Sequence, residues 1–227
     1  MRRYAAVMLD VDGTLVDSNV AHAHAWVDAF EERGVEISVE RVQRMIGMGG
    51  DRVIETVMGG RDDAVSERRS ELFRERWLSH VGPLLGSREL LLRLRDEGYP
   101  YVLASAAKAD ELEAVLQAAG IADLCELRTT SDEVDASKPD PASIEAALRK
   151  LDVDRSRVVM VGDTPYDLQA ARGASIDLIG FTSGGWSYDA LAGSVAIYAH
   201  PGDLLATWAA SPLGDARDCR DPAPPGR

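Results

Sequence analysis

Short, mostly apolar runs of five or six residues recur along this chain, and segments with helical periodicity separate most of them. Runs of this length and composition are typical of strands that a parallel sheet buries on both faces. The runs cover residues 4–9, 101–105, 158–162, 177–181 and 195–199, and the helical patterns cover 87–98, 109–120, 140–152 and 166–174. Strands that alternate with helices in this way predict an α/β protein with a doubly wound parallel sheet. We then expect any chemistry at the carboxyl ends of the strands.

One long stretch interrupts this alternation. Residues 17–82 carry repeated helical periodicity with no strand pattern between the helices, which predicts an inserted helical cap domain. The α/β core would then consist of residues 1–16 and 83–210, with the two connections near residues 17–19 and 82–83. Residues 211–227 are rich in Pro, Gly and charge, so we expect a disordered tail there.

Charge and cysteine usage exclude several classes of protein. A formal net charge of −13 argues against binding to nucleic acid or to an anionic membrane, because both surfaces would repel the chain. No run approaches the ~20 apolar residues of a membrane span, and no signal peptide is apparent, so we expect a cytoplasmic protein. Cys125 and Cys219 lie far apart and form neither a disulfide framework nor a zinc motif.

Two pairs of carboxylates follow predicted strands. Asp10 and Asp12 come directly after the first strand, and their spacing of two lets both side chains address one site. Asp163 and Asp167 follow the third strand with the helical spacing of four. Two unit charges ~4 Å apart repel by ~4 kcal/mol at an effective dielectric constant of ~20, so a cation is expected among them. Hard oxygen ligands without His or Cys favour Mg²⁺.

A lysine and a serine are predicted at the same edge of the sheet. Lys138 is followed by Pro139 and then by a helix, so it lies in a defined loop. Ser105 ends the second strand before a turn at Ala106, and its hydroxyl and the exposed backbone N–H groups could hold a phosphate oxygen. Both residues therefore fit a site for a phosphorylated molecule.

Together these residues resemble the haloacid dehalogenase superfamily. The first motif of that family, DxDGT with a following DS, is present as Asp10, Asp12, Gly13, Thr14, Asp17 and Ser18. The second motif matches Ser105, the third matches Lys138, and the fourth matches Gly162, Asp163 and Asp167. Order and spacing agree over residues 4–205, and the helical insertion directly follows the first motif, as in the family.

The resemblance implies a Rossmann-like core and a role for each motif residue. Asp10 would be the nucleophile that becomes aspartyl-phosphate, and Asp12 would be the general acid and base. Mg²⁺ would be held by Asp10, the backbone carbonyl of Asp12 and Asp163, with Asp167 in support. Phosphate would contact Gly13, Thr14, Ser105, Ala106 and Lys138. Because Asp12 has to carry a proton for the leaving oxygen, we expect its carboxylate neighbours to raise its pKa above ~3.9.

The chemistry of the first motif narrows the reaction. An acid two residues after the nucleophile favours phosphoryl transfer over dehalogenation, since a halide needs no proton on leaving. Helical caps at this position are typical of relatives similar to phosphoglycolate phosphatase and β-phosphoglucomutase. His22 stands where the mutases carry a cap histidine, but residues 75–83 contain no mutase-like lysine. We therefore expect a phosphatase, with a sugar phosphomutase as the alternative and a non-catalytic phosphometabolite-binding protein as the alternative of another class.

The cap carries candidates for substrate recognition. Gly49 and Gly50 belong to a Gly-rich turn, followed by Arg52 and preceded by Arg44, which could grip an anionic end of the substrate. The alternative is a tight turn between helices, and His22 is alternatively a partly buried helix residue without a catalytic role. The expected partner is a small phosphorylated metabolite, with neither nucleic acid nor membrane, and the chain is expected to act as a monomer or homodimer.

Overall fold

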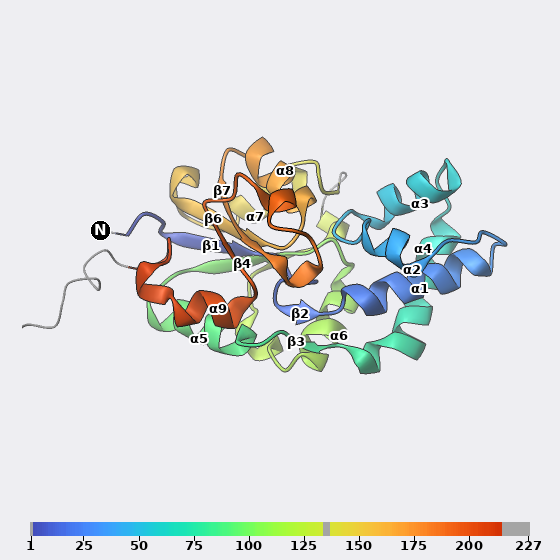
Figure 1. Cartoon of the computed structure of the whole chain (residues 1–227), viewed down its shortest axis with the longest axis horizontal. Coiled ribbons are helices and arrows are strands. Elements are labelled where there is room, and N and C mark those ends of the chain that lie inside the picture. The colour runs from blue at the N-terminus through green and yellow to red at the C-terminus, as the bar shows by residue number, and fades with distance from the viewer. Residues whose placement is uncertain (1, 134–136, 215–227) are drawn as a thin grey trace, which may run out of the picture.

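The computed structural model describes residues 2–133 and 137–214, which form a parallel sheet flanked by helices and a separate helical lobe (Figure 1). The sheet has six strands in the order β5-β4-β1-β6-β7-β8, and all pairs are parallel. The strands are β1 Ala6–Leu9, β4 Tyr101–Ala104, β5 Arg128–Thr129, β6 Val158–Gly162, β7 Asp177–Phe181 and β8 Ala196–Tyr198. This architecture confirms the predicted α/β fold class, although β5 was not expected from the sequence.

Helices cover both faces of the sheet because alternate strand residues point to opposite sides. Val7 and Leu9 of β1 pack into one hydrophobic cluster, with residues of α5, α6 and α9, whereas Ala6 and Met8 pack into a second cluster, with residues of α7 and α8. The helices are α5 Ser87–Asp96, α6 Ala109–Ala118, α7 Ala142–Leu148, α8 Pro165–Gly173 and α9 Pro201–Ala206. Across the two described ranges, no helix is both long and apolar enough to cross a membrane.

The helical lobe, here called the cap, has its own hydrophobic cluster, which includes Trp26, Phe30, Val42, Ile54 and Leu72. Its elements are α1 Asn19–Glu31, α2 Val39–Gln43, α3 Gly50–Met58, α4 Asp63–Leu72, the π-helical turn Phe73–Trp77 and the 3₁₀ turn Leu78–His80. Two short antiparallel strands, β2 Val16–Asp17 and β3 Gly82–Pro83, join the cap to the core (Figure 1). The sequence had indicated the two connections, but not that they pair.

The cap lies against the carboxyl edge of the sheet. Ser137 Oγ of the core donates a hydrogen bond to Asp51 Oδ1 of the cap at 2.6 Å, and Tyr166 Oη donates to the Arg44 carbonyl at 2.6 Å. Gly47 has a φ of +98°, and a Cβ there would lie 2.7 Å from Thr164 Cγ2, so only glycine allows this close approach. These contacts enclose the space between the two lobes.

Residues 211–214, predicted to belong to a disordered tail, pack against the core. Leu213 is buried, and its carbonyl accepts a hydrogen bond from Tyr99 Oη at 2.7 Å. Residues 215–227 of the expected disordered tail lie outside the described residues.

Candidate active site

The loop after β1 brings the first motif to the neighbouring strand β6. Strands β1 and β6 pair in register from Ala6 with Val158 to Leu9 with Val161, and the Asp10 N–H donates to the Val161 carbonyl at 2.9 Å. Gly13 turns the chain with a φ of +77°, and a Cβ there would lie 2.3 Å from Asp163 Oδ2. Sheet register and a glycine turn therefore place the first and fourth motifs in contact.

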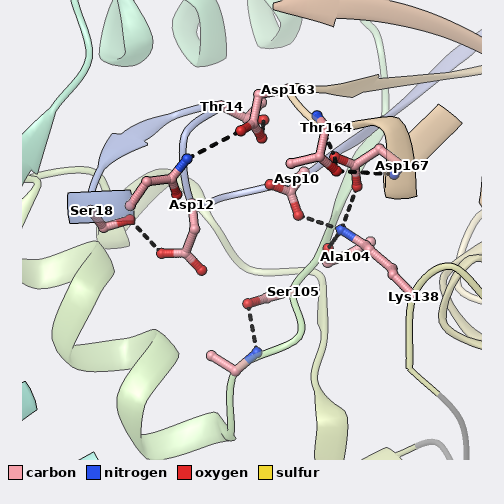
Figure 2. A network of polar contacts seen from close by, with 12 residues as sticks. Asp10, Asp12, Thr14, Ser18, Ala104, Ser105, Lys138, Asp163, Thr164 and Asp167 are labelled. Atoms are coloured by element: carbon pink, nitrogen blue, oxygen red, sulfur yellow. Dashed lines mark hydrogen bonds and ion pairs between the residues drawn. The ribbon is translucent and has the colours of Figure 1, made fainter. Parts of the chain in front are cut away.

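Three carboxylates converge at this edge, as Figure 2 shows. Asp10, Asp163 and Asp167 are buried, and each can offer an oxygen within 4.8 Å of the others. Lys138 lies between two of them: its Nζ donates to Asp10 and forms an ion pair with Asp167 Oδ1 at 2.8 Å. The same Nζ donates to the Ala104 carbonyl at 3.1 Å, which ties the lysine to the end of β4. Four sequence-predicted residues thus meet in one cluster.

The charge balance of this cluster is incomplete. Burial, with smaller effects from the charges of Asp167 and Asp12, raises the pKa of Asp10 to about 7 even though Lys138 acts to lower it. Burial and the charges of Asp10 and Asp167 also raise the pKa of Asp163 well above its ordinary value. Lys138 supplies one positive charge against three carboxylates. A set of hard oxygen donors with excess negative charge fits a divalent cation such as Mg²⁺, which Asp10, Asp163 and Asp167 would hold.

Asp12 lies beside the cluster and faces the cap. Its Oδ1 accepts a hydrogen bond from Ser18 Oγ at 2.6 Å and lies 3.0 Å from His22 Nε2. The His22 ring stacks on Phe73 with a centroid separation of 4.1 Å and an interplanar angle of 7°. The histidine is therefore fixed between the packing surface of the cap and the carboxylate of the core.

The environment of Asp12 overturns one expectation. Burial alone would raise its pKa, but the charge of His22 and the hydrogen bonds from His22 and Ser18 outweigh burial and lower the pKa to about 2. The expected rise in the pKa of Asp12 is therefore wrong for this arrangement. The reason is that His22, which reaches Asp12 from helix α1, together with Ser18 favours the ionised carboxylate more than burial opposes it.

Of the residues expected to bind phosphate, some lie at the space between the lobes and others are engaged in hydrogen bonds within the core. Ser105 is buried at the end of β4, its Oγ accepts a hydrogen bond from the Ala107 N–H at 3.1 Å, and Ala106 beside it lines the space between the lobes. The Thr14 hydroxyl instead donates to Asp163 Oδ1 at 2.8 Å, and the Gly13 N–H donates to the Val16 carbonyl. In this arrangement Thr14 orients a carboxylate, and Gly13 shapes the loop.

Two supporting residues were not expected from the sequence. Thr164 is the N-cap of α8, and its Oγ1 and N–H donate to Asp167 Oδ2 at 2.7 and 3.1 Å. Asn19 Nδ2 donates to Asp163 Oδ2 at 3.3 Å. The Thr-x-x-Asp spacing at residues 164–167 is a capping-box signature, so the sequence did carry a signal for Thr164.

The space between cap and core consists of two adjoining cavities. The inner cavity is lined by Asp10, Asp12, His22, Trp26, Met48 and Glu111, among others. The outer cavity has a volume of about 270 Å³, and Gly49, Asp51, Arg61, Lys108 and Ser137 are among the residues that line it. Gly50, Arg69 and Ala106 line both cavities, which marks where they meet.

The structure brings some of the expected cap residues to these cavities and leaves others elsewhere. His22, Gly49 and Gly50 line them. Arg44 instead lies with its Cζ 5.0 Å from the centre of the Trp186 ring, and Arg52 Nη1 lies 3.9 Å from Glu55 Oε2 with half of its side chain exposed. Arg69 and Glu111 line the inner cavity without having been expected, because no motif marks them.

Comparisons with known proteins agree on one family. A family model described as haloacid dehalogenase-like hydrolase matches residues 7–181. The phosphoglycolate phosphatase of Yersinia pseudotuberculosis is 32% identical over 213 residues, and the match covers 89% of each chain. The chloroplast protein SUPPRESSOR OF QUENCHING 1 of Arabidopsis thaliana is 30% identical over 187 residues, which are 78% of this chain but 18% of that protein. A solved hydrolase from Pseudomonas syringae superimposes with a TM-score of 0.86 at 28% identity, covering 93% of this chain and 100% of that one.

Proposed function

Because this chain belongs to the haloacid dehalogenase-like hydrolase family, we propose that it is a Mg²⁺-dependent phosphatase that hydrolyses a small phosphorylated metabolite through an aspartyl-phosphate on Asp10. Relatives named as phosphatases support hydrolysis of a phosphoric monoester. The observation that carries the proposal is that Asp10 and Asp12, one beside Lys138 and the other beside His22, line the same inner cavity. A nucleophile and a proton carrier are thus available to one bound phosphate.

In the first half of the proposed reaction, an Asp10 carboxylate oxygen forms a bond to phosphorus while the ester P–O bond breaks. Asp12 gives its proton to the leaving oxygen, and Lys138 keeps Asp10 oriented by the hydrogen bond to its carboxylate. Mg²⁺, when bound by the three carboxylates, would neutralise charge on the nucleophile and on the phosphate oxygens. A phosphate dianion beside Asp12 raises the pKa of that acid, because like charges oppose its ionisation.

In the second half, water attacks the aspartyl-phosphate. The water oxygen forms a bond to phosphorus, the bond from phosphorus to Asp10 breaks, and Asp12 accepts the proton from water. The low pKa of Asp12 in the arrangement described here favours its ionised form, which is the form that can accept this proton. The contact with His22 therefore supports the second half-reaction directly.

A sugar phosphomutase is the second candidate. The 3.0 Å contact between His22 and Asp12 favours it, because the resemblance to mutases implies a cap histidine that helps control the acid. A mutase would pass the phosphoryl group to a sugar hydroxyl, so an assay with a hexose 1-phosphate and a bisphosphate primer separates the two. Isomer formed without free phosphate supports the mutase, and free phosphate alone supports the phosphatase.

Phosphate release from para-nitrophenyl phosphate and from a panel of phosphorylated metabolites tests the proposed function. We expect release with Mg²⁺, none in EDTA, and none from the Asp10→Asn variant. Turnover that survives EDTA or the substitution contradicts the proposal. Tight binding of a metabolite with no phosphate release across the panel supports a binding protein instead.

A further inference from the structure

A buried ion pair joins the cap to the core where the two cavities meet. Arg69 of α4 places its Nη1 2.6 Å from Oε1 of Glu111, which belongs to α6. The side chains are 12% and 2% exposed, respectively. Glu111 lines the inner cavity together with Asp10 and Asp12, and Arg69 lines both cavities. A leaving group attached to a phosphate at Asp10 would therefore extend past this pair.

Each member of the pair has one buried atom without a hydrogen-bond partner among the described residues. These atoms are Arg69 Nε, a donor, and Glu111 Oε2, an acceptor. Buried polar atoms are normally paired, and an unpaired one is costly, so a ligand that pairs both atoms gains binding energy. Both atoms belong to side chains that line the cavities, so a leaving group held between cap and core is the ligand placed to pair them as it enters.

The chemistry of the two atoms indicates which leaving group fits. A hydroxyl group both donates and accepts, so one or two hydroxyl groups can satisfy Arg69 Nε and Glu111 Oε2 together. A carboxylate only accepts and would bring a negative charge beside Glu111. Like charges placed together across a binding site are strongly unfavourable, so this site disfavours a carboxylate.

The charges that line the two cavities are acidic on balance. Three acids, Asp51, Asp62 and Asp63, and three bases, Arg61, Arg69 and Lys108, line the outer cavity. Asp10, Asp12 and Glu111 of the inner cavity bring the described lining to six acids against three Lys and Arg side chains, and Arg69 is already paired. The outer cavity, with a volume of about 270 Å³, has room for a leaving group of several carbon atoms.

We propose that the Arg69–Glu111 pair selects a monophosphate whose leaving group is uncharged and carries hydroxyl groups, such as a sugar or polyol phosphate. Leaving groups that carry a carboxylate, such as glycolate, are disfavoured by the same pair. The inference rests on the proposed phosphatase function and specifies its substrate class. Arg69 and Glu111 act as specificity residues that contact the leaving group.

Matched substrates test this inference directly. Hydroxyethyl phosphate carries a CH₂OH group where phosphoglycolate carries a carboxylate, and the two are otherwise the same. Sorbitol 6-phosphate and 6-phosphogluconate differ in the same way. We expect kcat/KM to be at least ~10-fold higher for the hydroxyl member of each pair, because the like charge of Glu111 opposes the carboxylate. In Glu111→Gln this ratio should fall to within ~3-fold, since Arg69 is then free to pair with a carboxylate.

A neighbouring ion pair provides the matched control. Arg74 of the cap and Asp110 of α6 also join the two lobes, but their side chains are 41% and 63% exposed. Asp110→Asn should leave the substrate ratio unchanged, because this pair lies outside the cavities. If the Arg69–Glu111 pair only held the lobes together, Glu111→Gln would lower kcat/KM equally for both members of each substrate pair. The ratio compares two substrates of one preparation, so partial misfolding of a variant cancels.

Three outcomes would overturn the inference. A wild-type preference for the carboxylate member is one, and an unchanged ratio in Glu111→Gln is another. In both cases Asp10-dependent turnover of para-nitrophenyl phosphate would leave the proposed function intact. If the protein released phosphate from no monophosphate, the proposed function would fail and the inference with it.

Discussion

Replacing Asp10 by asparagine should abolish activity and yet stabilise the metal-free protein. Burial, with smaller effects from the charges of Asp167 and Asp12, raises the pKa of Asp10 to about 7. Between pH ~4 and pH ~7, Asp10 is therefore protonated in the folded chain but ionised in the unfolded chain. Because the folded chain binds the extra proton, the free energy of unfolding falls as pH rises through this range. Asparagine keeps the shape of the protonated acid and removes this cost, while Lys138 keeps its ion pair with Asp167.

The size of the effect follows from the raised pKa. The pKa of Asp10 rises from its ordinary value of 3.8 to about 7 on folding. At ~1.4 kcal/mol for each pKa unit, this rise means that keeping Asp10 ionised in the folded protein costs about 4 kcal/mol. In EDTA, the free energy of unfolding of Asp10→Asn should exceed that of the wild type by about 2 kcal/mol at pH 5 and by about 4 kcal/mol at pH 8. Mg²⁺ should raise the stability of the wild type more than that of the variant, because the ion binds the folded carboxylate cluster.

Urea denaturation at several pH values measures this difference. Asp123→Asn is the matched control: Asp123 is an exposed aspartate whose pKa is lowered by its hydrogen bonds from Arg88, so its replacement should not stabilise the protein at any pH. If Asp10→Asn were no more stable than the wild type at pH 8 in EDTA, the cost inferred for keeping ionised Asp10 buried in the metal-free cluster would be refuted.

Three further predictions concern other parts of the chain. His22→Gln should raise the pKa of Asp12 from about 2, which would move the acidic limb of the pH profile of aspartyl-phosphate hydrolysis to higher pH because Asp12 must be ionised to accept the proton from water, and an unmoved limb would refute the role of the histidine. Burial raises the pKa of the Cys125 thiol to about 12, so in a Cys219→Ser variant a thiol reagent at pH 8 should react only after unfolding, and rapid reaction of the folded chain would contradict this. Thr164→Val should cost about 1 kcal/mol of stability in urea through loss of the N-cap of α8, whereas an unchanged midpoint would show that the cap contributes nothing.

The sequence was sufficient to predict the architecture and the carboxylate cluster, because both follow from local patterns. Apolar runs and helical periodicity define the parallel sheet, and strands β1 and β6 lie side by side in it, so the residues after them meet. The missed strands β2, β3 and β5 contain two residues each, which is too short for any periodicity. Their pairing depends on the tertiary structure around them.

The rest of the site depends on contacts that no local pattern encodes. The direction of the pKa shift of Asp12 depends on His22. This histidine belongs to α1 and contacts Asp12 only when the cap packs against the core. Arg69 and Glu111 lie 42 residues apart and belong to different lobes, so their pairing has no signature in the sequence. Arg44 and Arg52 were expected at the substrate because they flank a Gly-rich turn, but their side chains contact Trp186 and Glu55.

The central claim is that Asp10 carries the phosphoryl group and Asp12 moves the proton. Asp12→Asn with para-nitrophenyl phosphate and Mg²⁺ isolates the first half-reaction, because nitrophenolate leaves without a proton while water attack still needs the base. After an acid quench, mass spectrometry should find one phosphoryl group on the peptide that contains residue 10, together with a burst of one nitrophenol per chain. A phosphoryl group on another residue, or a burst that leaves residue 10 unmodified, would contradict the account.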